Sequence, residues 1–320
     1  MQTYLKTRPI GVQLLFFVGM AVGIFMIVFF FGGMILAQIT GIKLLDMGNY
    51  KAWNPNDPAV LSMLRGTFLL QFLGLFLIPS FLFAKASDPR PGQYLGLRAP
   101  SHAGYWLLAV VALLVAIPLV EYTGLLNKEL IQHSPFQKKA GEMEESAARA
   151  LGVVLKMRTI GDLLLNLVFI AVFAGVGEEL FFRGIVQRLF IKGTRSPWAG
   201  ILIAAFLFSF FHMQFYGFLP RFLLGILLGA AYWYSGSLWP SIFAHFFYDA
   251  LFITIAYFKP ETVTSDAPVL QNSGLMLPVA LISAALTGLL VWLMRRQSDT
   301  RFEAVYADEL RPQPAKDLRF

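Results

Sequence analysis

Six ionisable side chains lie inside long apolar stretches of the sequence, where charged groups are rare. A charge at the centre of a bilayer costs at least about 2.5–3.5 kcal/mol on insertion scales, so such groups are paired or face a wet cavity. A single buried pair would fit a structural tie between helices, whereas a set of six favours a functional site. The six residues are Glu178, Glu179, Arg183, His212, His245 and Asp249.

The spacing of these residues places them on shared helix faces and at a similar depth. Glu179 and Arg183 are four residues apart, so they meet on one helix face, where the arginine would hold the glutamate ionised. His245 and Asp249 are also four residues apart, so they share a helix face. Glu178 and His212 each lie roughly 21 Å along their helices from the short loop that joins them. The second histidine and the aspartate lie roughly 13–20 Å from Gly236, so we expect all of these groups in one layer.

Together these side chains contain the groups that peptide hydrolysis requires. The reaction needs an activated water, a stabiliser for the oxyanion and a proton donor for the amine. Glu178 is the candidate that activates water, because a carboxylate in a low-dielectric cavity is a stronger base. His212 could hold this water or carry its proton, since histidine titrates near neutrality. His245 could polarise the carbonyl or stabilise the oxyanion, with Asp249 orienting its ring.

A metal-dependent version of this chemistry is also open. Two histidines and one glutamate form a known catalytic zinc set with a fourth position for water, and Glu178, His212 and His245 would supply it for a divalent metal such as zinc. No His-Glu-x-x-His segment is present, so these ligands would come from three helices. We favour water activated directly by glutamate. A serine nucleophile is disfavoured because no Gly-x-Ser-x-Gly segment occurs, and Ser209 and Ser241 are interpreted as helix-packing residues.

Long apolar runs must carry these side chains. The chain has 320 residues, of which 57% are hydrophobic and 14% charged, whereas a soluble domain carries about 25% charged residues. A bilayer core requires roughly 20 apolar residues per helix. The sequence therefore predicts an all-α, polytopic membrane helix bundle. Its approximately eight transmembrane helices are expected at about 11–37, 62–84, 103–121, 162–190, 197–214, 218–235, 237–258 and 275–294.

The loops and termini suggest an orientation in the membrane. Residues 1–296 form one membrane unit with its core at about 160–258, and 297–320 is predicted to be a polar, solvated cytoplasmic tail. Eight spans place both termini on one side, and the excess of Lys and Arg on that side predicts that it is cytoplasmic, in an inner or plasma membrane. The connection 122–161 predicts a partly amphipathic helix at the opposite interface. The net charge of +7 suits anionic lipid, and no basic cluster is dense enough to bind nucleic acid.

The motifs resemble those of the CPBP, or Abi, family of intramembrane proteases, which comprises CAAX prenyl endopeptidases and bacteriocin-processing proteins. Residues 178–183 match the family motif Glu-Glu-x-x-x-Arg. Phe208 and His212 match Phe-x-x-x-His. His245 begins the third motif, His-x-x-x-Asn, in which Asp249 replaces the usual asparagine.

This resemblance implies an eight-helix fold with a cavity that opens toward the cytoplasm. It also implies that Glu178 activates water and that the two histidines and position 249 complete the site. An asparagine amide can donate to an oxyanion, whereas an ionised Asp249 would repel it. The aspartate must therefore be protonated, hydrogen-bond to His245 or bind a cation. The implied substrate is a hydrophobic or lipidated peptide or protein terminus at the bilayer.

Two other functions are compatible with a multi-pass chain of this kind. A non-proteolytic scaffold or immunity-type protein would keep the fold and bind a peptide or a partner membrane protein, since fold does not guarantee function. It predicts that Glu178→Ala leaves the phenotype unchanged. A transporter would use the charged cluster as an ion or proton relay, but the sequence shows no repeated half and no paired broken helices.

Overall fold

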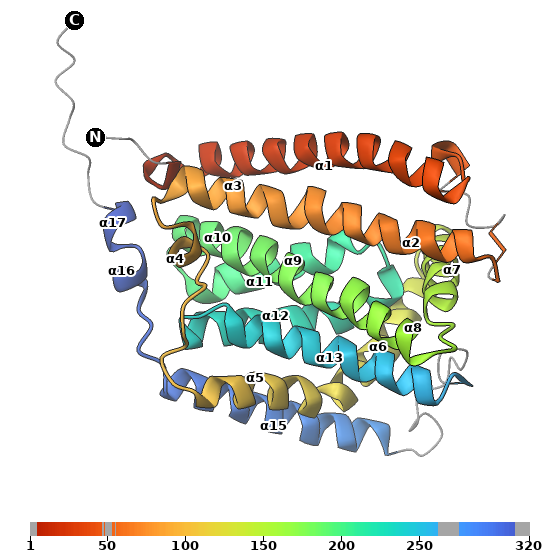
Figure 1. Cartoon of the computed structure of the whole chain (residues 1–320). Helices are drawn as coiled ribbons and strands as arrows, with labels where there is room; N and C mark the ends of the chain where they lie inside the picture. Colours follow the sequence, from red (N-terminus) through yellow and green to blue (C-terminus); the bar gives the residue numbers. More distant parts are fainter. Residues whose placement is uncertain (1–4, 47, 49–52, 55, 262–274, 311–320) are drawn as a thin grey trace, which may run out of the picture.

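The computed structural model describes residues 5–46, 48, 53–54, 56–261 and 275–310. Within these ranges the chain forms helices and no strand, and most of the helices lie side by side along one direction (Figure 1). This confirms the prediction of an all-α, polytopic membrane bundle. The helices of the described ranges that are long and apolar enough to cross a membrane are Ile10–Thr40, Pro58–Ser87, Ile160–Thr194, Phe215–Ser235, Trp239–Phe258 and Met276–Arg296.

Two of the eight predicted spans are less regular than the others. The third consists of α5 (Gly104–Val115) and α6 (Ile117–Gln132), which are bent by 42° where they meet. Ser283 supports this bend, because its hydroxyl donates to the carbonyl of Val115 at 2.6 Å and accepts from the amide of Leu119 at 3.3 Å. The fifth predicted span is the short apolar helix α11 (Pro197–Phe211). The described residues therefore contain six helices that can each cross a membrane, one bent pair of helices and one shorter apolar helix.

The fourth span, Ile160–Thr194, carries the adjacent glutamates and is not a uniform α-helix. A capping box in which Thr159 and Asp162 bond each other's backbone amides begins the span. Two of its segments have π-helical turns, which occur mostly at functional sites. Its parts are α8 (Ile160–Asn166), η5 (Leu167–Val172), α9 (Phe173–Glu178), η6 (Glu179–Gln187) and α10 (Arg188–Thr194).

Glycines allow this span and its neighbours to approach closely. A Cβ atom on Gly175 would lie 3.0 Å from the backbone nitrogen of Phe246 in α13 (Trp239–Phe258). A Cβ atom on Gly225, in α12 (Phe218–Ser235), would lie 3.0 Å from the Cβ atom of Ala205 in α11. Small residues of this kind are typical of packed membrane helices, because they let the backbones approach. They bring the helices with the glutamates and histidines together.

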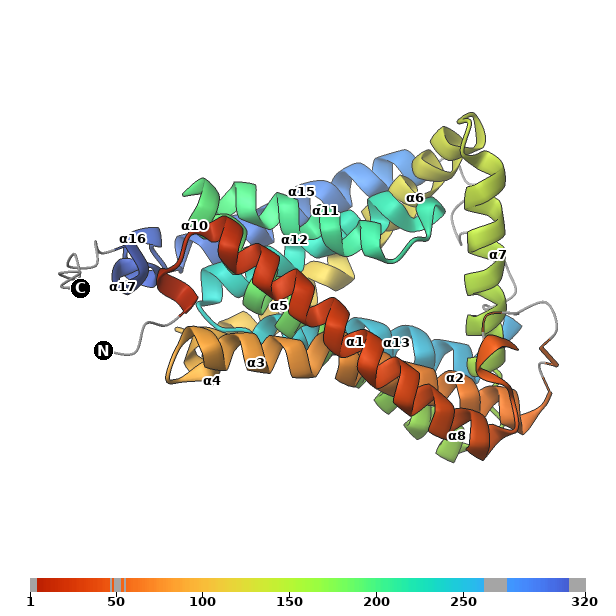
Figure 2. The same cartoon turned by 90° about the horizontal axis from the view of Figure 1, so that it is seen from above.

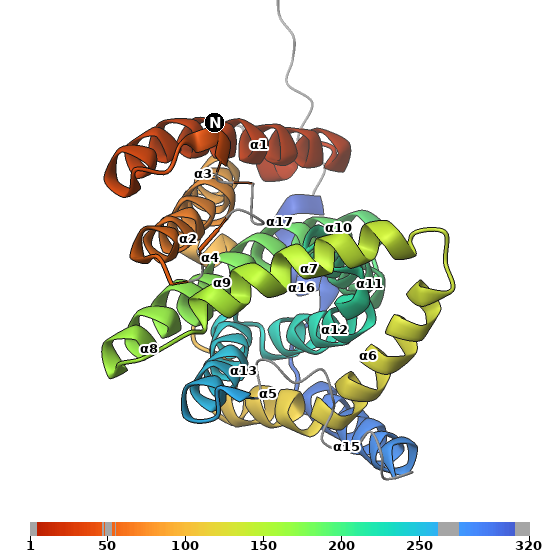
Figure 3. The same ribbon diagram turned by 90° about the vertical axis from the view of Figure 1, so that its right-hand side faces the viewer.

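One helix lies across the end of the bundle that is opposite the termini. This helix is α7 (Gln137–Val154), and it runs crosswise to the spans (Figures 2 and 3). It contacts α6, α2 (Pro58–Gln71) and η7 (Phe215–Gly217). The sequence predicted a helix in this connection, and the structure adds that it bridges separate spans.

The segment after the last span, α15 (Met276–Arg296), differs from the predicted solvated tail. Two short helices, α16 (Phe302–Val305) and α17 (Ala307–Leu310), pack against the end of the bundle that carries the termini (Figure 1). The Tyr306 side chain is buried, and its hydroxyl donates to the carbonyl of Arg188. Glu309 forms ion pairs with Arg188 and Lys192. These contacts explain why a mostly polar segment packs against the bundle. Residues 311–320 of the predicted tail lie outside the described residues.

Candidate active site

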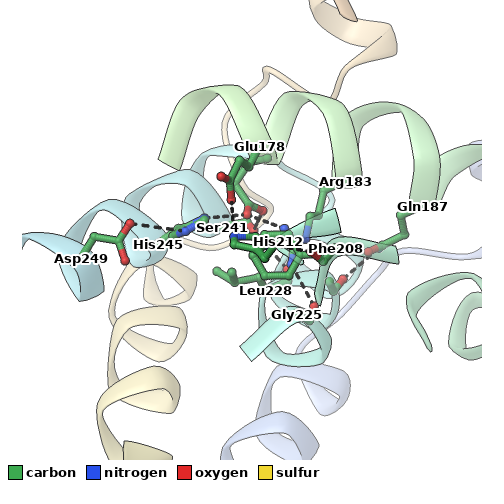
Figure 4. A network of polar contacts seen from close by, with 12 residues as sticks. Glu178, Arg183, Gln187, Phe208, His212, Gly225, Leu228, Ser241, His245 and Asp249 are labelled. Carbon is green, nitrogen blue, oxygen red and sulfur yellow. Dashed lines mark hydrogen bonds and ion pairs between the residues drawn. The ribbon is translucent and has the colours of Figure 1, made fainter. Parts of the chain in front are cut away.

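All six ionisable residues that the sequence singled out lie close together in the structure (Figure 4). Glu178 and Glu179 lie at the junction of α9 and η6, with Arg183 one turn further along η6. His212 follows the last residue of α11, while His245 and Asp249 lie on α13. Three separate spans therefore contribute to one polar cluster, as the matched depths predicted.

Glu179 is the centre of the cluster and is completely buried. Its Oε1 accepts from Arg183 Nη1 at 2.6 Å and lies 2.9 Å from His245 Nδ1. Its Oε2 accepts from the hydroxyl of Ser241 on α13. Arg183 also donates to the carbonyl of Gly225 at 3.1 Å, so the pair joins η6 to α12 as well as to α13. Glu179 therefore has hydrogen-bond partners for both carboxylate oxygens.

Glu178 has a different environment, although it is the next residue in the chain. Its side chain is 13% exposed, and its Oε2 atom lies 3.9 Å from Nε2 of His212. This distance exceeds a hydrogen bond, and within the described part of the chain the Oε2 atom has no hydrogen-bond partner. An unpartnered carboxylate oxygen in a membrane bundle is costly, and such exceptions occur where a group has a catalytic role.

The ring of His212 is oriented by its own helix. Nδ1 lies 2.7 Å from the carbonyl oxygen of Phe208. A carbonyl oxygen only accepts, so Nδ1 carries the hydrogen and Nε2 of the neutral ring presents its lone pair toward Glu178. The next residue, Met213, has φ = 55°, a left-handed conformation that is uncommon for residues other than glycine. The helix therefore stops inside the bundle, and such local strain is often found at functional sites.

The second histidine lies between two carboxylates. His245 Nδ1 faces Glu179 at 2.9 Å, and its Nε2 lies 3.6 Å from Oδ2 of Asp249. The second distance is longer than a hydrogen bond, so Asp249 lies beside the ring but does not hydrogen-bond to it. The hydrogen bond to His245, one of the three expected ways to accommodate an aspartate here, is therefore not formed, and Asp249 lies at ion-pair distance from the ring. The Nε2 atom is left without a hydrogen bond to the protein in the described residues.

Two residues of the site were not identified from the sequence. Ser241, which was interpreted as a packing residue, donates to Glu179 and is fully buried. Its position four residues before His245 on the same helix face is the signal that could have revealed it. Gln187 lies one turn after Arg183 on η6 and donates to the carbonyl of Gly229 at 3.0 Å.

The possible zinc ligands do not form a metal-binding arrangement in the residues that the structure describes. These residues contain no group of three or more His, Cys, Asp or Glu side chains that could hold a metal ion. Nδ1 of His212 bonds a carbonyl and Nδ1 of His245 bonds Glu179, while Nε2 of each ring makes no hydrogen bond to the described part of the protein.

A small apolar cavity of about 150 Å³ lies beside Glu178. Phenylalanines of the second and fourth spans form most of its wall, and Gln71 is the polar residue that shares it with the glutamate. The cavity is lined by Phe68, Gln71, Phe72, Phe76, Phe169, Ile170, Phe173, Ala174 and Glu178.

The fold and the cluster together define a multi-pass membrane protein with a buried glutamate–histidine site. Residues 160–251 match the family model of Rce1-like, type II CAAX prenyl endopeptidases, and this segment contains all six candidate residues. In this segment the chain is similar to the Rce1-like, type II CAAX prenyl endopeptidases. An uncharacterized 24.3 kDa protein of Escherichia coli is 28% identical over 190 residues, which cover 57% of this chain and 74% of that protein. No solved structure matches the chain significantly.

Proposed function

We propose that the protein is an intramembrane endopeptidase that hydrolyses a peptide bond with a water activated by Glu178 and His212. The observation that carries this proposal is the 3.9 Å separation of Glu178 Oε2 and His212 Nε2, neither of which bonds another protein atom in the described residues. The match of residues 160–251 to the model of type II CAAX prenyl endopeptidases supports the same reaction class. The substrate is a hydrophobic or lipidated peptide or protein segment at the bilayer.

The geometry suits a bridging water. An oxygen atom about 2.8 Å from both side chains forms ordinary hydrogen bonds with Glu178 and His212. Glu178 then accepts a proton as the water oxygen attacks the scissile carbonyl carbon, and the same proton passes to the amine when the C–N bond breaks. His212 holds the water through Nε2, because its other nitrogen is fixed by the carbonyl of Phe208.

His245 is placed to stabilise the oxyanion. Its Nδ1 atom faces a carboxylate oxygen of Glu179 that is already paired with Arg183, so Nδ1 carries a hydrogen. A hydrogen on Nε2 as well would be directed at the developing charge, with Asp249 nearby to balance the cationic ring. Preorganised donors of this kind act strongly in sites that exclude water. Arg183 and Glu179 are positioning residues in this scheme, and no step is assigned to a metal.

The first test compares peptide termini in membranes and medium from cells that produce the wild-type protein, Glu178→Gln or His212→Gln at equal membrane levels. We expect a set of termini to disappear in both variants, because loss of a general base costs about 10²–10⁴-fold in rate. Glu129→Gln is the matched control, since Glu129 lies on the exposed end of α6. Unchanged termini, with a persisting effect of deleting the protein, would favour the scaffold function.

A metal requirement is tested with the same substrates after purification. Dialysis against a chelator should leave the rate of the purified protein unchanged, since the proposed chemistry uses only side chains of this chain. Loss of activity that returns with added zinc would show that the histidines rearrange to bind the ion.

We also propose that the protein lies in an inner or plasma membrane with cytoplasmic termini. The excess of basic residues near Lys6 and after the last span supports this orientation. The cavity beside Glu178 is lined by residues around the middle of the spans Pro58–Ser87 and Ile160–Thr194. Labelling from each side of the membrane tests the orientation.

A further inference from the structure

The apolar cavity adjoins the polar cluster, because Glu178 lines the cavity and also faces His212. Ala174 lies in its wall four residues before Glu178, so both face it from the same side of the helix. Phe72 and Phe173 stack at 4.4 Å with their rings nearly parallel, and form one side of it. A scissile bond held at Glu178 must place a flanking substrate residue against this wall.

We propose that this cavity is a specificity subsite that accepts one large apolar side chain, phenyl-sized or isobutyl-sized, of a peptide substrate, next to the bond that is cleaved. This inference rests on the proposed peptidase function and adds to it the kind of residue that selects the cleavage site. The phenylalanine side chains supply the apolar contacts. The small side chain of Ala174 leaves room in the cavity for the substrate side chain.

The size of the cavity supports a single side chain. Its volume is about 150 Å³. An apolar protein cavity of about 150 Å³ lined by Leu, Ile and Phe holds a benzene molecule. A polyprenyl or acyl chain is several times larger than a benzene ring, so only a fraction of such a chain would fit. The volume therefore matches one aromatic or branched aliphatic residue.

Gln71 supports a peptide over a lipid chain as the occupant. Its amide lines the cavity within the apolar span Pro58–Ser87 and makes no side-chain hydrogen bond in the part of the chain that the structure describes. Unpaired polar groups are expensive inside a bilayer. A peptide backbone offers both a donor and an acceptor to this amide, whereas a hydrocarbon chain offers neither.

The absence of cysteine from the sequence makes occupancy of the cavity measurable without catalysis. Ala174→Cys would place the one thiol of the protein in the cavity wall, and Val168→Cys would place it on the 43% exposed, outward side of the same span as a control. Both variants in nanodiscs are labelled with a maleimide in the presence of short blocked peptides that carry Phe, Leu or Gly at one position.

We expect the Phe and Leu peptides to slow labelling of Ala174→Cys at least about tenfold relative to the Gly peptide, since even one methylene in an apolar pocket is worth roughly 10–200-fold. Labelling of Val168→Cys should not change. Adding Gln71→Leu should weaken protection by the peptides. Protection by farnesol or oleate but not by the peptides would overturn the proposal in favour of a lipid chain, and equal labelling with all peptides would also overturn it.

Cleavage specificity gives an independent readout. A pool of hydrophobic peptides is incubated with wild-type protein, Ala174→Phe and Val168→Phe, and the cut bonds are identified by mass spectrometry. Ala174→Phe should shift the residue beside the cut from Phe and Leu to Gly, Ala and Ser by at least about tenfold. An unchanged residue preference would refute the subsite. Protection in the labelling experiment without Glu178-dependent cleavage would leave the binding site standing and refute the peptidase function.

Discussion

Glu178 and Glu179 are adjacent in the chain but have opposite surroundings. Glu179 is buried and bonded to Arg183, His245 and Ser241, whereas Glu178 faces His212 across 3.9 Å. Removing one member of a buried ion pair typically costs 3–5 kcal/mol because the other charge is left uncompensated. Replacing Glu178 and replacing Glu179 should therefore have different effects on stability and activity.

We expect Glu179→Gln to lower both stability and activity, and Glu178→Gln to lower activity alone. The predicted loss of stability for Glu179→Gln is about 3–5 kcal/mol, because Arg183 loses its counter-charge. Thermal unfolding of both variants in the same detergent measures the difference. Equal unfolding temperatures for the two variants would contradict the assignment of Glu179 as the structural centre.

The aspartate at position 249 can be tested at the same scale. Its Oδ2 lies 3.6 Å from Nε2 of His245, so it acts through proximity and charge and not through a fixed hydrogen bond. Asp249→Asn keeps the shape and removes the charge, which should weaken the support for a cationic ring and reduce kcat more than KM. Asp249→Ala should reduce kcat at least as much. A faster Asp249→Asn variant would show that an amide at this position stabilises the oxyanion directly.

At the scale of elements, α7 closes the end of the bundle that lies nearest to the cavity. Its carboxylate Glu144 faces Arg221 and Lys128, yet burial raises the pKa of Glu144 despite these two charges. A carboxyl group with a raised folded pKa favours the folded arrangement at pH below its ordinary value, and this contribution is lost as pH rises through the folded pKa.

The docking of α7 should therefore be firmer near pH 5 than near pH 8. Hydrogen exchange of residues 137–154, corrected for the intrinsic effect of pH, measures this difference. Glu144→Gln should remove it, while Glu145→Gln, at an exposed position of the same helix, should not. Slower exchange at the higher pH in the wild-type protein would show that electrostatic attraction to Arg221 outweighs burial.

The short helices α16 and α17 contact the end of the span Ile160–Thr194. The Arg188 guanidinium lies 4.5 Å from the ring centre of Tyr94 and 5.1 Å from that of Tyr306, and Glu309 pairs with the same arginine. Replacing a buried aromatic residue by alanine costs about 3–5 kcal/mol, so Tyr306→Ala should lower the unfolding temperature. Leu310→Ala, at a 41% exposed position, is the control. Equal unfolding temperatures would mean that the segment is not packed in the membrane protein.

At the scale of the whole molecule, the orientation in the membrane decides which compartment the cavity faces. Lys139 on α7 is 72% exposed, and Gln297 lies just after the last span at the opposite end. With cytoplasmic termini, Lys139→Cys should react with an impermeant maleimide in intact cells, and Gln297→Cys only after the membrane is disrupted. The reverse pattern would overturn the orientation that the basic residues predicted.

The sequence alone determined the class of fold and the members of the polar cluster. Apolar runs of about 20 residues have one stable solution in a bilayer, because every backbone group must be bonded within its own helix. Ionisable residues inside such runs are costly enough to mark a site, and fixed helical spacing placed Glu179 beside Arg183 and His245 beside Asp249. These inferences use local geometry and solvation, which do not depend on neighbouring helices.

Only the tertiary structure decided which contacts each member of the cluster makes. The division between a free Glu178 and a fully bonded Glu179 depends on which side chains of α11 and α13 face the junction of α9 and η6. The role of Ser241, the early end of α11 at His212 and the packing of Tyr306 also require contacts between residues far apart in the chain. Such contacts depend on how the helices pack against one another. A sequence indicates which face of a helix is buried, but it does not indicate which other helices cover that face.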